Sequence, residues 1–140
     1  MDFAMAGPAI VLGLGCIGSA IGCGIAGMAS HAVMARVDDN HGKFIGLSAV
    51  SSSQSIYAFV LMFLMRDAIR SNLLSPISAI AIGFACGLAI MISAIYQGMC
   101  AATAIQTVAK QPALFGKSIG ALVVIESFSL FACVFALLLF

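Results

Sequence analysis

Long apolar stretches alternate with short polar segments along the 140-residue chain. Nearly all charged residues fall in three polar segments, at residues 36–43, 66–70 and 110–117. Four apolar stretches remain, at residues 4–35, 44–65, 75–109 and 118–140. Each can cross a hydrocarbon core of about 30 Å as a helix that rises about 1.5 Å per residue. Because lipid cannot pair with exposed backbone groups, the pattern predicts an all-α membrane protein with four transmembrane helices.

The second half of the chain repeats the first at an offset of 74 residues. This shift aligns residues 42–46 with residues 116–120, and Ser19-Ala20-Ile21 with Ser93-Ala94-Ile95. We therefore expect one membrane domain, residues 1–140, made of two tandem helical hairpins at residues 1–66 and 75–140. Because each hairpin has an even number of helices, both run the same way through the membrane, as a parallel repeat.

Composition agrees with a membrane protein, since 63% of the residues are hydrophobic and 8% are charged. Soluble domains have about 45–50% apolar and about 25% charged residues. No basic cluster is present, so we expect no nucleic-acid partner. Glycines at residues 13–18 and 22–27 match the dinucleotide pattern G-x-G-x-x-G, but that pattern requires a preceding strand. Small residues on several helix faces instead favour close helix packing, as on the inner wall of a ring of subunits.

Loop charges predict the orientation in the membrane. The segments 36–43 and 110–117 share one side and together carry four Lys or Arg residues, whereas the segment 66–70 carries two. The excess of positive charge places the hairpin loops 36–43 and 110–117 in the cytoplasm. We expect a multi-pass membrane protein.

Glu126 is the one charged residue in the apolar run 119–140. A carboxylate inside a bilayer costs about 3 kcal/mol or more, so it indicates a function. Gln54 and Gln97 also fall near the middle of their spans, with Ser53 and Tyr57 beside Gln54. Hard oxygen ligands with a single negative charge suit a small monovalent cation such as Na⁺. The residues leave open a second interpretation, in which the amides only join helices and Glu126 stays protonated.

Several segments resemble the proteolipid, or K subunit, of V-type ATPases, and most of all the bacterial sodium-translocating type. The resemblance covers essentially the whole chain and implies a location in the bacterial plasma membrane. The segments that carry it are Ser53-Gln54-Ser55-Ile56-Tyr57, Tyr96-Gln97-Gly98, Ala101-Ala102-Thr103-Ala104-Ile105-Gln106 and Ile125-Glu126-Ser127-Phe128. Two positions depart from the family pattern, because Ser53 replaces a threonine and Ser51 replaces a proline.

The resemblance implies a membrane rotor in which identical subunits form a ring. The ring would turn against a stator subunit that supplies an arginine, and its cytoplasmic loops would dock a central stalk. The coupling ion would be Na⁺ or H⁺, without an organic cofactor, and ATP hydrolysis or synthesis would occur in partner subunits rather than in this chain. The implied ion ligands are Glu126, Gln97, Gln54, Ser53 and the backbone carbonyl of Val50, with Tyr57 hydrogen-bonded to the carboxylate.

Two other classes of protein fit four helices with a membrane glutamate. A small multidrug or cation antiporter has a similar size, but such proteins carry the acid in the first helix and tend to have tryptophan near the substrate. This chain has its glutamate in the last span and has no tryptophan. A structural, channel-like oligomer is the other alternative.

Overall fold

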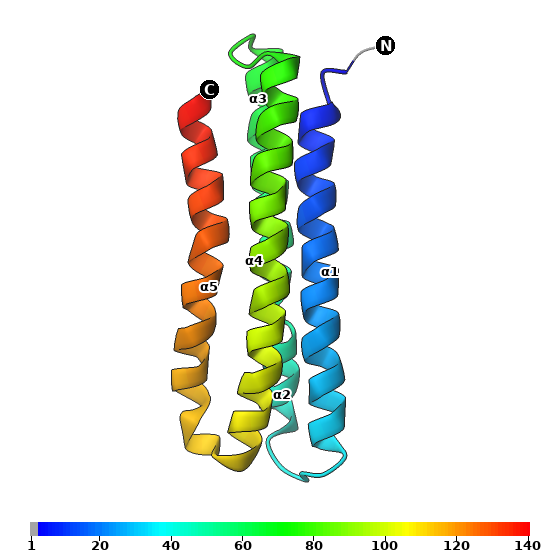
Figure 1. Ribbon diagram of the computed structural model, residues 1–140, viewed down its shortest axis with the longest axis vertical. Coiled ribbons are helices and arrows are strands. Elements are labelled where there is room, and N and C mark those ends of the chain that lie inside the picture. The colour runs from blue at the N-terminus through cyan, green and yellow to red at the C-terminus, as the bar shows by residue number, and fades with distance from the viewer. Residues whose placement is uncertain (1–2) are drawn as a thin grey trace.

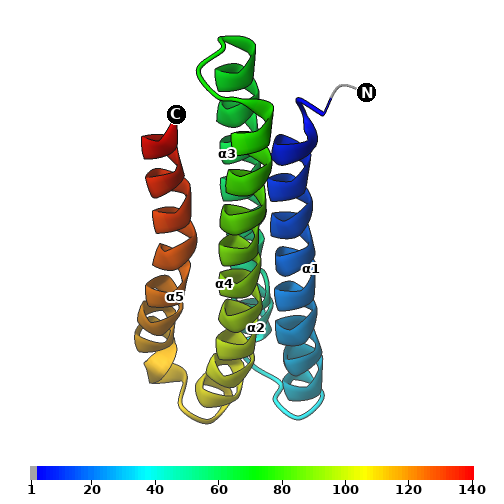
Figure 2. The same ribbon diagram turned by 45° about the horizontal axis from the view of Figure 1, so that its top comes forward.

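Four helical rods stand side by side in the computed structural model, which describes residues 3–140 (Figure 1). The first described residues, the C-terminus and the loop at residues 71–75 lie at one end of the bundle, and the two hairpin loops lie at the other (Figures 1 and 2). Among the described residues there are four spans long and apolar enough to cross a membrane, and there is no strand. The expected all-α fold is confirmed.

The first, third and fourth spans follow the apolar stretches to within a few residues. They are α1 (Ala6–Met34), α4 (Pro76–Lys110), and α5 (Phe115–Ala136), which a 3₁₀ turn precedes (Pro112–Leu114) and another follows (Leu137–Leu139). Ser75 caps α4, because its hydroxyl accepts a hydrogen bond from the amide of Ser78 at 3.1 Å, and Pro76 occupies the first helical turn. The ends of these helices thus coincide with sequence signals.

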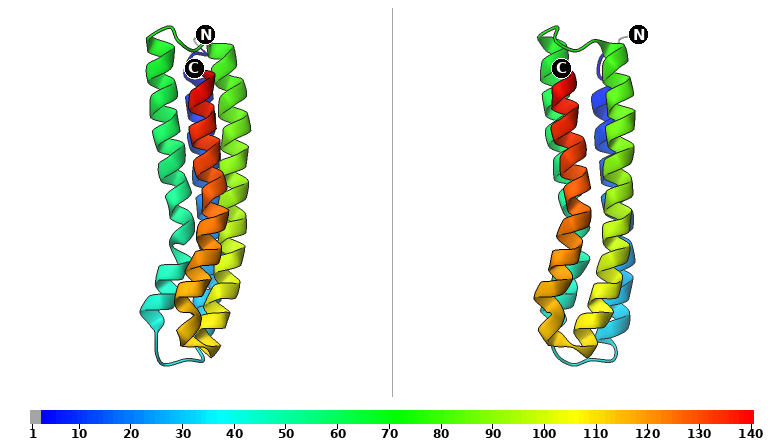
Figure 3. Two further views of the ribbon diagram at one scale, coloured as in Figure 1. Left: turned by 90° about the vertical axis from the view of Figure 1, so that its left-hand side faces the viewer. Right: turned by 60° about the vertical axis from the view of Figure 1, so that its left-hand side comes forward.

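The second span is not the continuous helix that the run 44–65 predicts. It consists of α2 (His41–Ser48), a 3₁₀ turn (Val50–Ser52) and α3 (Ser53–Arg70), and the displacement between α2 and α3 is visible in Figure 3. Serine hydroxyls bond to nearby carbonyls at the break, where such bonds can compete with helical geometry. Ser52 Oγ donates to the Ala49 carbonyl at 2.7 Å, and Ser53 Oγ donates to the Val50 carbonyl at 3.1 Å. The break therefore forms without a proline at position 51.

Helices α1 and α4 pack against each other most extensively, and α5 lies in front of α3 and α4 in the left view of Figure 3. Glycine permits the close approach of α1 and α4. A β-carbon on Gly98 would overlap the backbone of Gly22, and one on Gly83 would overlap the backbone of Gly7. Close backbone contact of this kind stabilises helix pairs where lipid removes the hydrophobic driving force.

Candidate ion-binding site

Glu126 lies on α5 where this helix faces α3, and its side chain is half-buried. The phenol of Tyr57 on α3 donates a hydrogen bond to Glu126 Oε1 at 2.8 Å. Within residues 3–140 this is the one hydrogen bond of the carboxylate, and no cation pairs with it. The acid is thus held by a neutral donor from a neighbouring helix.

Two fully buried amides lie beside this pair. Gln54 on α3 and Gln97 on α4 both have 0% exposure. Gln54 Nε2 donates to Gln97 Oε1 at 2.5 Å, and Gln97 Nε2 donates to the Leu122 carbonyl on α5 at 3.1 Å. The amides therefore link all three helices, and each buried amide nitrogen has an acceptor.

The Leu122 carbonyl determines which way both amides point. It can only accept, so the Gln97 atom facing it must be the nitrogen, and the oxygen of Gln97 then faces Gln54. The Gln54 atom that meets this oxygen must in turn be nitrogen, which directs the oxygen of Gln54 towards Ser53. Each amide oxygen therefore accepts one hydrogen bond and keeps a second lone pair.

The break between α2 and α3 adds further oxygen atoms beside Gln54. Ser53 Oγ lies 3.1 Å from the Val50 carbonyl oxygen and 3.3 Å from Gln54 Oε1. A 3₁₀ turn followed by an α-helix brings a backbone carbonyl, a hydroxyl and an amide oxygen together at one level of the span. A continuous helix would keep the Val50 carbonyl in the regular helical ladder.

Ser93 on α4 is a residue near the site that sequence reasoning missed. Its hydroxyl donates to the Ile125 carbonyl at 2.8 Å, next to Glu126. Together with the bond from Gln97 to Leu122, this contact fastens α5 to α4 at two successive turns. The spacing of four residues between Ser93 and Gln97, which puts both on one face of α4, is the signal that could have revealed it.

The structure thus brings most of the predicted residues together, in two neighbouring groups. One contains Val50, Ser53, Gln54 and Gln97, and the other contains Tyr57 and Glu126. Neither amide is hydrogen-bonded to the carboxylate in the described part of the chain, but Leu122, which Gln97 contacts, is one helical turn before Glu126. No group of three or more His, Cys, Asp or Glu side chains suited to a metal occurs among residues 3–140. The arrangement can offer a monovalent ion several neutral oxygens and one carboxylate.

Comparison with known proteins finds the same family in both halves of the chain. The sequence profile of the family formed by the C subunit of ATP synthase matches residues 6–65 and again residues 80–139. These two matches begin 74 residues apart, which is the offset of the internal repeat. The tandem duplication predicted from the sequence is thereby confirmed.

A curated relative agrees with the family match. The chain is 32% identical, over 133 residues, to the A-type ATP synthase subunit K of Methanocaldococcus jannaschii. The aligned region covers 95% of this chain and 59% of the relative, so the chain spans somewhat less than two thirds of that protein's length. The resemblance to the rotary-ATPase proteolipids is confirmed.

Proposed function

The chain belongs to the family of the ATP synthase C subunit, and we propose that it is a rotor subunit of an A- or V-type ATP synthase that carries a cation on Glu126. Identical copies would form a ring in the membrane. The ring would turn against a stator subunit, whose arginine would meet each emptied carboxylate. Nucleotide chemistry would take place in partner subunits, with the hairpin loops 36–43 and 110–117 docking a central stalk in the cytoplasm.

The observation that carries this proposal is the position of Glu126 within the fourth span. Its carboxylate accepts a bond from Tyr57, and the nearby buried amides each have an oxygen that accepts one hydrogen bond and keeps a second lone pair. Neither buried amide is hydrogen-bonded to the carboxylate in the described part of the chain. Here the amides satisfy each other and the Leu122 carbonyl, which leaves the carboxylate available.

The donor set favours Na⁺ over H⁺ as the cargo. A proton needs only the carboxylate, whereas Na⁺ needs several hard oxygens at one place. Val50, Ser53, Gln54 and Gln97 supply neutral oxygens, so a bound Na⁺ would cancel the single negative charge of Glu126. A loaded site would then be neutral and could face lipid, while an empty site would need a positive partner.

Reaction of Glu126 with a hydrophobic carbodiimide in the intact ATPase tests the carrier role. We expect labelling at Glu126 that Na⁺ suppresses at constant ionic strength, and no labelling of the variant Glu126→Gln. Protection by lipophilic cations but not by Na⁺ would support the antiporter alternative. An acid that reacts irrespective of any cation would support a proton carrier or a structural role.

The rate of ATP hydrolysis by the complete complex distinguishes a sodium carrier, a proton carrier and a structural acid. A sodium rotor should hydrolyse ATP faster as Na⁺ is added, and carbodiimide should abolish this stimulation. Hydrolysis that is independent of Na⁺ but sensitive to carbodiimide would assign H⁺ as the cargo. Hydrolysis that is insensitive to carbodiimide, despite labelling of Glu126, would refute the carrier role.

A further inference from the structure

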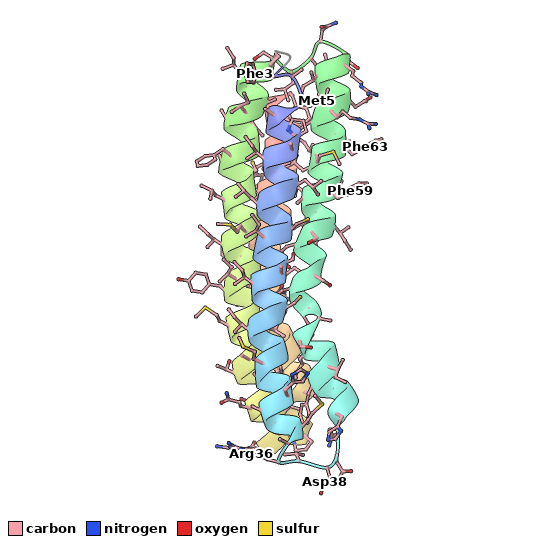
Figure 4. All side chains as sticks on the ribbon, turned by 90° about the vertical axis from the view of Figure 1, so that its right-hand side faces the viewer. Phe3, Met5, Arg36, Asp38, Phe59 and Phe63 are labelled. Carbon is pink, nitrogen blue, oxygen red and sulfur yellow. The ribbon has the colours of Figure 1, made fainter. Side chains whose placement is uncertain are left out.

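Four side chains on the outer side of α3 form a row that we call the α3 stripe: Phe59, Phe63, Arg66 and Arg70. Their spacing of four, three and four residues places them on one face of the helix. Phe59 is 52% exposed and Phe63 is 46% exposed, and both project away from α1 (Figure 4). The stripe therefore faces the surroundings of the bundle rather than its core.

The α3 stripe changes from apolar to basic at the depth where a bilayer changes from acyl chains to headgroups. Gln54 lies near the middle of its span, and Phe63 and Arg66 follow it by nine and twelve residues. At about 1.5 Å per residue, Phe63 stands about 14 Å and Arg66 about 18 Å from the level of Gln54. The hydrocarbon edge lies about 15 Å from the middle of a bilayer. The phenylalanines thus lie beside acyl chains, and the arginines lie among the headgroups.

Both arginines of the stripe lack an anionic partner within residues 3–140. The guanidinium carbon of Arg66 lies 4.7 Å from the centre of the Phe63 ring, so the aromatic face positions the charged group. Arg66 Nε is buried and has no hydrogen-bond acceptor in the described part of the chain. Arg70, one turn further along α3, is exposed. Two positioned guanidinium groups without acceptors suit an anion from outside the chain, and arginine binds phosphate especially well.

We propose that the α3 stripe binds an anionic phospholipid, with the phosphate on Arg66 and Arg70 and an acyl chain along Phe63 and Phe59. Side chains one helical turn apart have β-carbons about 5–6 Å apart, so both arginines can bond to one phosphate. With Asp67 beside them, the two arginines give a local charge of +1, which one phosphate cancels. A zwitterionic headgroup carries an ammonium group that would restore this positive charge. The site therefore selects an anionic lipid.

The second hairpin has no counterpart of this stripe. The residues 74 positions after Phe59, Phe63 and Arg66 are Cys133, Leu137 and Phe140. Each copy of the chain therefore provides one lipid site, at the end of the bundle opposite the hairpin loops (Figure 1). The inference goes beyond the proposed rotor function and does not depend on it, because the site needs only the outer face of α3 in a bilayer.

Fluorescence quenching tests the lipid site, because the chain has no tryptophan of its own. Phe63→Trp places one fluorophore in the stripe and keeps an aromatic face for Arg66. The full chain is reconstituted in vesicles of phosphatidylglycerol and phosphatidylcholine in equal amounts, with brominated acyl chains on one lipid or on the other. We expect brominated phosphatidylglycerol to quench more strongly, because a local charge of +1 favours an anionic lipid roughly fivefold. Equal quenching by the two lipids would overturn the inference.

Phe135→Trp is the matched control for position in the bilayer. Phe135 on α5 is 61% exposed and follows Glu126 by nine residues, as Phe63 follows Gln54 by nine, so the two side chains stand at similar depths. No charged residue occurs at residues 127–140, so both lipids should quench this variant equally. The same preference for phosphatidylglycerol in both variants would reflect attraction to the whole protein and would refute a site on α3.

Charge variants in the Phe63→Trp background identify the anchor. Arg66→Gln with Arg70→Gln should abolish the preference while both lipids still quench, whereas Arg36→Gln, at the opposite end of the bundle, should keep it (Figure 4). A preference that survives the loss of Arg66 and Arg70, or that Arg36→Gln also abolishes, would contradict the proposed anchor.

Two further outcomes exclude other occupants of the stripe. A preference that disappears when inorganic phosphate replaces chloride at constant ionic strength would indicate a site for free anions and overturn the lipid assignment. A fluorophore in Phe63→Trp that neither lipid quenches would indicate a protein contact and would overturn it as well. None of these measurements requires ion transport, so the lipid site and the proposed rotor function can fail independently.

Discussion

The substitution Gln97→Leu removes the side chain that joins the three helices of the ion site. Gln97 accepts from Gln54 Nε2 at 2.5 Å and donates to the Leu122 carbonyl at 3.1 Å, in a fully buried setting. Leucine has a similar size, so the change deletes polar groups without opening a large cavity. The Gln54 amide loses its acceptor, and the proposed site loses one oxygen ligand.

The expected loss of Na⁺ affinity follows from the energy of hydrogen bonds and ion contacts to charged groups. Such contacts contribute about 1.5–3 kcal/mol each, and each 1.4 kcal/mol corresponds to about tenfold in affinity. We therefore expect the Na⁺ concentration that half-protects Glu126 from carbodiimide to rise roughly 10- to 150-fold. Labelling without Na⁺ should persist, because Tyr57 still holds the carboxylate.

The measurement is a titration of carbodiimide labelling against Na⁺ in the intact ATPase, at fixed pH and ionic strength. Gln106→Leu is the matched control, because Gln106 is an exposed amide on the same helix. It should leave the half-protecting Na⁺ concentration within about twofold of the unaltered value, a change of under about 0.5 kcal/mol. Equal Na⁺ protection in Gln97→Leu and Gln106→Leu would refute the assignment of Gln97 as a ligand.

Three further substitutions probe the acid, its donor and the helix contact. Glu126→Gln should abolish ion-coupled ATP hydrolysis while native mass spectrometry still detects the ring, and loss of the ring would point to a structural role. Tyr57→Phe should raise the half-protecting Na⁺ concentration roughly tenfold because it removes the hydroxyl that donates to the carboxylate, whereas Tyr96→Phe should not. Gly98→Leu should lower the thermal midpoint of the purified protein, because overpacking against the backbone of α1 costs about 1–3 kcal/mol of stability. An unchanged midpoint would contradict the packing of α1 against α4.

The number of spans, the repeat and the central acid follow from the sequence alone. Lipid requires every backbone group to be paired within its own segment, so apolar length translates directly into helices. The offset of 74 residues is visible in matching segments such as Ser19-Ala20-Ile21 and Ser93-Ala94-Ile95, without any coordinates. Glu126 stands out because a carboxylate in the middle of an apolar run of that length is visible in the sequence and costly in a bilayer.

The break in the second span lay beyond sequence reasoning because it depends on competition between weak local bonds. Serine hydroxyls can bond to the helix without breaking it, and only the packed structure shows which outcome prevails. That break places the Ser53 hydroxyl next to the Val50 carbonyl. The resemblance to a family pointed to both residues, but their spacing alone did not explain why a carbonyl and a hydroxyl would meet.

Tertiary structure alone decided which polar groups face one another and which glycines are covered. Gln54 and Gln97 lie on different helices, and their orientation is determined by a carbonyl of a third helix, so no local pattern encodes it. Likewise Gly22 and Gly24 are alike in sequence, but one contacts α4 and the other faces outward. Local interactions specify helices, whereas the relative rotation of those helices is set by contacts between residues far apart in the chain.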